Sequence, residues 1–190
     1  MATYYTSDIH FSDERIMRLC HRPFQTATEM DECIIERWNE RVGPDDVVWV
    51  LGDIVSPEHF NAALLNRLNG RVLVLAGNHD YPCHGKIMDK TRLRVWVESL
   101  FYWEEGLTVL SHCPIMDWVG RESGTVHLYG HVHNKHIPGM AEYYADKLAF
   151  NVSMDTNDFR PKTLKELVCE AGKLPLFRAV HGERVRGFDF

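Results

Sequence analysis

The sequence lacks features that would place it in several large classes of protein. Its five cysteines form no Cys-x-x-Cys pair, which argues against a cysteine-rich zinc site and a disulfide framework. Lys and Arg number 21 against 27 Asp and Glu, a net charge of -6, so no broad basic face for duplex DNA or anionic lipid is expected. Its apolar runs, such as residues 47–51, are far shorter than the ~20 residues that span a bilayer. No signal peptide is visible at the N-terminus, so we expect a cytoplasmic protein with free thiols and no membrane segment.

The chain also has no internal repeat, no low-complexity stretch and no Pro/Gly/Ser-rich linker. We therefore expect one domain over residues 1–190. Short apolar runs alternate with helical patterns, which predicts an α/β fold. The expected strands cover residues 3–7, 47–51, 71–76, 107–110, 126–129 and 148–152.

Helix-capping patterns mark the expected helices. One helix should begin after Ser12, a second at the capping box Thr26-x-x-Glu29, and a third at Ser56-Pro57 with an apolar stripe that reaches residue 68. A short helix is expected at residues 163–171, whereas residues 86–100 give no clear pattern. The tail, residues 173–190, is expected to pack loosely.

Side chains that bind metals follow five of the expected strands, at the point where each strand ends. In chain order the motifs are Asp8-x-His10, Gly52-Asp53, Gly77-Asn78-His79-Asp80, Ser111-His112 and Gly130-His131-Val132-His133. Ligand sites in α/β sheets form at the carboxyl ends of strands, so we expect these motifs to meet. In an extended chain both members of each Asp/His-x-His pair would point the same way. The glycines before three of the motifs allow close backbone approach.

Seven donors would converge at this edge, which is too many for one zinc ion. They are Asp8, His10, Asp53, Asn78, His112, His131 and His133. Carboxylate, amide and imidazole ligands together suit borderline ions such as Mn, Fe, Zn, Co or Ni. Two ions about 3.5–4 Å apart, bridged by one carboxylate, would use the whole set. Asp53 lies in the middle of the set and is the expected bridge.

The order of these motifs resembles the calcineurin-like metallophosphoesterase superfamily. Its pattern of D-x-H, G-D, G-N-H-[D/E], a lone His and G-H-x-H is complete here between residues 3 and 133. The segments SDIHFSDERI, LSHCP and LYGHVHN are most similar to small bacterial and phage members. Five motifs in family order, each after an expected strand, make the resemblance specific.

The resemblance implies a four-layer α/β/β/α sandwich that holds two divalent metal ions, with Mn²⁺ expected first. One ion would be held by Asp8, His10, Asp53 and His133, and the other by Asp53, Asn78, His112 and His131. The implied reaction is hydrolysis of a phosphate ester by in-line attack of a metal-bridging hydroxide. His79 would protonate or stabilise the leaving oxygen. Asp80 would either orient the ring of His79 or cap the next turn.

The substrate and the partners are less specified. We expect a small phosphodiester or phosphomonoester. The alternatives are a single-strand nuclease, which would need a clustered basic face, and a catalytically silent scaffold that binds a protein. Arg22, Arg121 and Lys135 are either phosphate contacts or solvated charges. The aromatic residues Trp103, Trp118, Tyr143 and Tyr144 could stack on a flat leaving group, pack in the core or support a homodimer. Six histidines outside the pattern are expected at the surface or in packing: His21, His59, His84, His127, His136 and His181.

Overall fold

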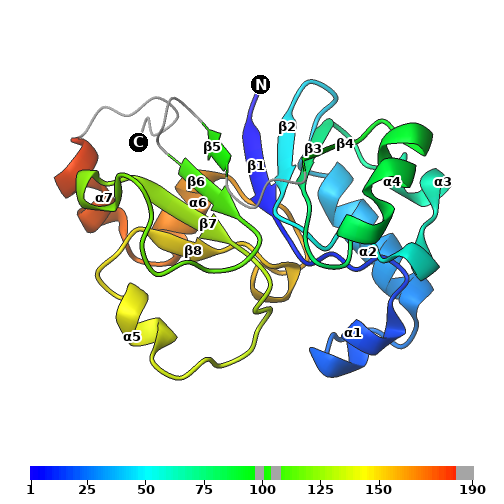
Figure 1. The fold of residues 1–190 in the computed structure, drawn as a ribbon, viewed down its shortest axis with the longest axis horizontal. Helices are drawn as coiled ribbons and strands as arrows, with labels where there is room; N and C mark the ends of the chain where they lie inside the picture. The colour runs from blue at the N-terminus through cyan, green and yellow to red at the C-terminus, as the bar shows by residue number, and fades with distance from the viewer. Residues whose placement is uncertain (97–100, 104–107, 183–190) are drawn as a thin grey trace.

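The computed structural model describes residues 1–96, 101–103 and 108–182, and two sheets lie at its centre (Figure 1). The first sheet has the order β1 (Thr3–Thr6), β2 (Val47–Val50), β3 (Arg71–Leu75), β4 (Arg94–Trp96), and all its strands are parallel. The second has the order β5 (Phe101–Trp103), β6 (Thr108–Ser111), β7 (Val126–Tyr129), β8 (Ala149–Asn151). In this sheet β5 is antiparallel to β6, and the other pairs are parallel.

Helices connect these strands and confirm the predicted α/β class. They are α1 (Glu14–Leu19), α2 (Ala27–Asn39), α3 (Ala62–Leu65), α4 (His84–Lys90), α5 (Met140–Tyr144), α6 (Leu164–Glu170) and α7 (Leu174–His181). Short 3-10 turns lie at η1 (Pro57–His59), η2 (Tyr81–Cys83), η3 (Arg121–Ser123) and η4 (Met154–Thr156). None of the helices in the described part of the chain has the length and hydropathy needed to cross a membrane.

The first sheet is buried on both faces. On one face Val48 and Val74 pack against Ile34 and Trp38 of α2, with residues of α3 and α4 in the same cluster. The apolar stripe predicted for α2 is therefore the face that contacts the sheet. On the other face side chains such as Trp49 pack against the second sheet, and residues of α6 and α7 join this cluster. The layers thus run helix, sheet, sheet.

The outer face of the second sheet carries an aromatic cluster. Tyr129 of β7 packs with Trp118 and with Tyr144 of α5, and the buried ring of His127 lies 5.1 Å from that of Trp118. Trp118 and Tyr144 are thus packing residues rather than a platform for a leaving group. The side chain of Trp103 and the position of Leu107, the first residue of an expected strand, lie outside what the structure describes.

The predicted cap of one helix and the predicted extent of another are wrong. Asp13, not Ser12, caps α1 by accepting from the N–H groups of Arg15 and Ile16, because Ser12 donates its own N–H and hydroxyl to Asp31 of α2. The helix expected from Ser56 is divided into η1 and α3, because Asn61 starts a new helix by accepting from the N–H groups of residues 63 and 64.

Two isolated bridges tie β1 and the residue after it to the chain that follows β8. Tyr5 pairs with Lys162, and Ser7, just after β1, pairs in parallel with Ser153, just after β8. The carbonyl of Ser7 also accepts from the N–H of Met154 at 3.0 Å. The carboxyl ends of β1, β2 and β3 therefore meet those of β6, β7 and β8 at one edge of the molecule.

The C-terminal segment contributes to the core as far as the structure describes it. Residues 174–181 form α7, and Phe177 is 1% exposed in the cluster between the sheets. The rest of the tail that was expected to pack loosely, residues 183–190, lies outside the described residues.

The Phe177→Ala variant should lower the free energy of unfolding by about 3–5 kcal/mol, since it removes a buried aromatic ring and leaves a cavity. Val180→Ala in the same helix is the matched control, because Val180 is 44% exposed. Urea denaturation measures both. Equal stability of the two variants would show that α7 does not pack as described.

Candidate metal centre

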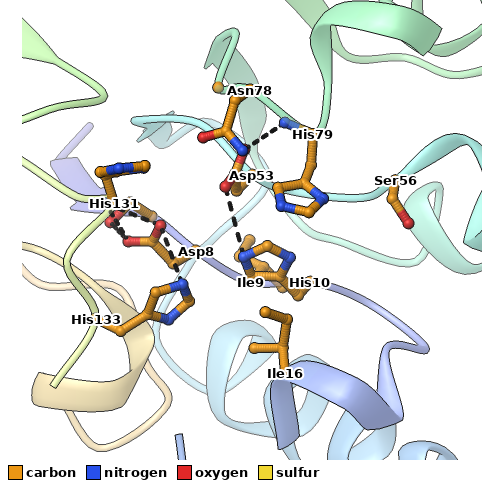
Figure 2. A network of polar contacts seen from close by, with 12 residues as sticks. Asp8, Ile9, His10, Ile16, Asp53, Ser56, Asn78, His79, His131 and His133 are labelled. Atoms are coloured by element: carbon orange, nitrogen blue, oxygen red, sulfur yellow. Dashed lines mark hydrogen bonds and ion pairs between the residues drawn. The ribbon is translucent and has the colours of Figure 1, made fainter. Parts of the chain in front are cut away.

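The loops that follow five strands converge at the common edge of the sheets and bring the seven predicted donors together. Figure 2 labels all of them except His112. Asp8 and His10 follow β1, Asp53 follows β2, and Asn78 follows β3. The second sheet supplies the three others, His112 after β6 and His131 and His133 after β7. Each sheet thus contributes part of the set.

Asp53 lies between histidines of the two sheets. Its Oδ2 is 3.6 Å from Nε2 of His10 and 3.4 Å from Nε2 of His112. Its Oδ1 accepts a hydrogen bond of 2.9 Å from the N–H of His79. One oxygen therefore positions a loop while the other faces two potential metal ligands.

Asp8 forms a similar contact with the loop after β7. Its two carboxylate oxygens accept from the N–H of His131 at 2.9 and 3.0 Å, and Oδ2 also accepts from the hydroxyl of Ser7 at 2.6 Å. Its Oδ1 lies 3.8 Å from Nε2 of His133. The ring of His133 stacks on that of His10, with 5.2 Å between centroids.

A second group of donors surrounds His112. Its Nε2 lies 3.0 Å from Oδ1 of Asn78 and 3.2 Å from Nδ1 of His131. Its Nδ1 lies 2.8 Å from the carbonyl of Leu51. Because a carbonyl only accepts, Nδ1 carries a proton in this contact. Nε2 therefore faces Asn78 and His131, the two neighbouring predicted metal ligands.

His10 shows that the site fits a cation. Its side chain is 1% exposed, yet neither ring nitrogen has a hydrogen-bond partner within the described residues. Buried polar atoms normally have a partner, and a bound ion is one explanation for such an exception. Burial lowers the pKa of His10 to about 3, which keeps the ring neutral, as a metal ligand must be.

Two of the other predicted ligands, Asp53 and His112, are coupled electrostatically. Burial opposes ionisation of Asp53, but the hydrogen bond and charge of His112 outweigh it and lower the pKa of Asp53 to about 2. Burial likewise opposes protonation of His112, but Asp53 and then Asp8 raise its pKa to about 9. A divalent cation would compete with a proton for His112.

The ligand backbone is not extended, which corrects the expected reason for the Asp/His-x-His spacing. Asp8, His10, Asp53, His131 and His133 all have φ between 52° and 70°, the left-handed region that non-glycine residues rarely adopt. Hydrogen bonds hold these bends, including those from the N–H of Asp8 and of His10 to the carbonyls of Gly52 and Asp53. Strained backbone of this kind is concentrated at functional sites.

The three glycines allow the expected close approach. A Cβ on Gly52 would lie 2.3 Å from Nδ1 of His112, and one on Gly77 would lie 2.2 Å from Oδ1 of Asp53. A Cβ on Gly130 would lie 2.6 Å from Oδ2 of Asp8. Each glycine thus packs against a ligand that belongs to a different loop.

Asp80 has neither of the two roles expected for it. Its buried carboxylate accepts from four backbone N–H groups: those of Asp53, Ile54, Val55 and Gly77, at 2.6–3.1 Å. It forms no cap bond to η2, and no bond from it to the ring of His79 is present in the described structure. Asp80 therefore joins the loop after β2 to the loop after β3.

The sequence did not indicate the roles of Arg22 and Asp155. Arg22 is neither a phosphate contact nor a solvated charge, because its side chain is fully buried in an ion pair with Asp155. Nδ1 of His133 lies 2.7 Å from Asp155. The signal that could have found Asp155 is its position shortly after β8, whose carboxyl end lies at the same edge as the other ligand loops.

A cleft of about 600 Å³ leads from the donors along α1. Among the residues that line it are Asp53, Asn78, His79, His131 and His133. Both signs of charge line the rest, including Arg15, Arg18 and Lys135 beside Glu14 and Glu58. The ring of His79 lies edge-on to His10, 4.9 Å between centroids. Arg121, another candidate phosphate contact, is paired with Asp117 instead.

Comparison with known proteins defines the class. Residues 1–188 match the family described as calcineurin-like phosphoesterase. The chain therefore belongs to this family, as its motifs predicted.

Several relatives share most of its length. It is 30% identical over 176 residues to the uncharacterized protein MJ1445 of Methanocaldococcus jannaschii. This match covers 90% of the chain and 93% of the relative. It is 31% identical to the Gene 66 protein of Mycobacterium phage D29, over 70% of this chain and 79% of the relative. The fold is shared with a crystal structure of AQ665 from Aquifex aeolicus, a protein of unknown function, at a TM-score of 0.69 and 22% identity. That match covers 88% of this chain and 98% of the other.

The Gly130→Ala variant should fold but bind metal at least about tenfold more weakly, because the added methyl displaces Asp8 and Ser7. Gly85→Ala is the control, since a Cβ there meets nothing within 4 Å. Calorimetric titration with Mn²⁺ measures both. Unchanged affinity in Gly130→Ala would contradict the close approach of this glycine to the site.

Proposed function

We propose that this protein is a dinuclear-metal phosphoesterase that hydrolyses a small phosphodiester or phosphomonoester. The observation that carries the proposal is the convergence of all seven donors at one edge, around a buried histidine whose ring nitrogens find no hydrogen-bond partner among the described residues. Family membership supports metal-dependent phosphoester chemistry in general.

The positions of the donors support two ions that share Asp53. The first ion would be held by Asp8, His10, Asp53 and His133, and the second by Asp53, Asn78, His112 and His131. Oδ2 of Asp53 faces His10 of the first group and His112 of the second, as a bridging carboxylate requires. Mn²⁺ is the ion proposed first, with Fe, Zn, Ni or Co as alternatives that the same ligands accept.

Bound divalent ions would supply an activated water near neutral pH and neutralise the charge of the phosphoryl oxygens. The chain's own contribution is orientation and proton transfer. Asp53 accepts a hydrogen bond from the N–H of His79, and this contact fixes His79 in the lining of the cleft. The imidazole of His79 is there the group proposed to protonate the leaving oxygen.

The cleft favours a small substrate. Its volume of about 600 Å³ lies within the range of small-molecule sites. Glu14 and Glu58 line it together with the basic residues, so it offers no continuous basic track of the kind that single-stranded nucleic acid requires. The nuclease and the silent scaffold remain the two alternatives, and the following experiment distinguishes them from the phosphoesterase.

Metal-stripped protein should hydrolyse neither bis-p-nitrophenyl phosphate nor p-nitrophenyl phosphate, and added Mn²⁺ should restore turnover. The Asn78→Ala variant should fold yet lose most of that turnover, since it removes one ligand and leaves the core intact. Release of nitrophenol and circular dichroism measure the two effects. Preference for the diester or the monoester would identify the substrate class.

Three outcomes would contradict the proposal. Full activity of Asn78→Ala would contradict the ligand set. Two bound ions without turnover would favour the scaffold. Cleavage of single-stranded oligonucleotides far above that of the small esters would favour the nuclease.

The His79→Ala variant should lose about 10²-fold or more in rate on esters with poor leaving groups, such as alkyl phosphates, because these need a proton donor. Its loss on nitrophenyl esters should be much smaller, since nitrophenolate leaves without protonation. His136→Ala, at an exposed position, is the control. Equal losses on both kinds of ester would remove His79 from the role of acid.

A further inference from the structure

A buried ion pair lies directly behind the metal centre. Nε and Nη2 of Arg22 donate to Oδ1 and Oδ2 of Asp155 at 2.8 and 2.9 Å. Their side chains are 0% and 1% exposed. Arg22 therefore cannot contact a substrate, and a pair so fully removed from water needs a specific compensating role or rich hydrogen bonding.

Arg22 also binds the backbone of the first ligand loop. Its Nη2 donates to the carbonyl of Asp8 at 2.6 Å, and its Nη1 donates to the carbonyl of Ile9 at 2.7 Å. These carbonyls lie between the side chains of Asp8 and His10, where the backbone has the strained left-handed conformation. The guanidinium thus holds the bend that presents both ligands.

Asp155 orients the third ligand of the same group. Its Oδ2 lies 2.7 Å from Nδ1 of His133, and an ionised carboxylate only accepts, so the proton of the ring is on Nδ1. Burial opposes ionisation of Asp155, but hydrogen bonds from His133 and Arg22 outweigh it and hold its pKa below the usual range. Nε2 of His133 then faces Asp8 and is the nitrogen available to a metal.

We propose that Arg22 and Asp155 are positioning residues for one of the two ion sites, the one formed by Asp8, His10 and His133. This inference rests on the proposed dinuclear centre. The ligands of the other site are oriented by different groups, because Leu51 binds His112 and Asp80 holds the loops after β2 and β3. A change at Asp155 should therefore affect the two ions unequally.

The Asp155→Asn variant tests this inequality. In the carboxylate, Oδ2 accepts from Nη2 of Arg22 and from Nδ1 of His133, while Oδ1 accepts from Nε of Arg22. An amide has one oxygen and cannot reproduce all three contacts. If its NH₂ faces His133, Nδ1 must become the acceptor and the ring proton moves to Nε2, where it blocks the metal. If the NH₂ takes the place of Oδ1, it opposes the N–H of Arg22 Nε, and two hydrogen-bond donors then face each other.

Asp158→Asn is the matched control. Asp158 lies three residues further along the chain and is also paired with an arginine, Arg37, at 2.8 Å. This pair is largely exposed and does not contact a predicted ligand in the described structure. Asn also tolerates the left-handed backbone of this position, φ 55°.

Calorimetric titration with Mn²⁺ should give two ions for the unaltered protein and for Asp158→Asn. In Asp155→Asn one of the two ions should bind about 10–100-fold more weakly while the other changes less than about threefold. Equal binding by all three proteins, or equal weakening of both ions, would overturn the role of Asp155. Fewer than two ions on the unaltered protein would instead overturn the dinuclear centre itself, and the inference with it.

A measurement on the unaltered chain keeps the inference testable if Asp155→Asn fails to fold. In protein loaded with Zn²⁺, two-bond ¹H–¹⁵N spectra should show the proton of His133 on Nδ1 and none on Nε2. A proton on Nε2 would overturn the inference, because that nitrogen would then be closed to the metal.

Discussion

The buried carboxylates of Asp8 and Asp53 impose the main constraint on this structure. An ionised carboxylate out of water is destabilising unless hydrogen bonds and opposite charge compensate it. Asp8 accepts from the backbone of His131, and Asp53 accepts from the backbone of His79. Each carboxylate therefore holds a loop that carries other site residues, and the loops after β1, β2, β3 and β7 stabilise one another. The same carboxylates and their histidines form a site suited to divalent cations.

The centre is prearranged by strained backbone and by close packing. Left-handed conformations at five of the donors carry a free-energy cost of order 1–3 kcal/mol each, which the surrounding contacts must offset. Gly52, Gly77 and Gly130 let the loops approach closely enough to make those contacts. Arg22, Asp155 and Asp80 are buried side chains that bind the backbone of the donor loops or a donor itself. A metal ion would thus meet ligands that are already oriented.

Several sequence patterns predicted local structure well because their causes are local. Uniformly apolar runs such as residues 47–50 and 72–75 are strands, because parallel strands are buried on both faces. The spacing of Ile34 and Trp38 placed one face of α2 against the sheet. The start of α1 was missed because Ser12 and Asp13 are both good caps, and a contact with Asp31 of another helix decided between them. Local propensity carries no information about such a partner.

By itself the sequence determined the α/β class and the family and predicted the set of donors, since the motifs and the alternation of strands and helices are written along the chain. Only the tertiary structure decided how the donors face one another and which residues support them. Asp80 and Arg22 are of residue types that usually lie at the surface or cap helices. Both are nevertheless buried and bind groups far away in the sequence. The partners of a buried charge come from other strands and loops, so its role depends on how the sheets pack and not on its neighbours in the chain.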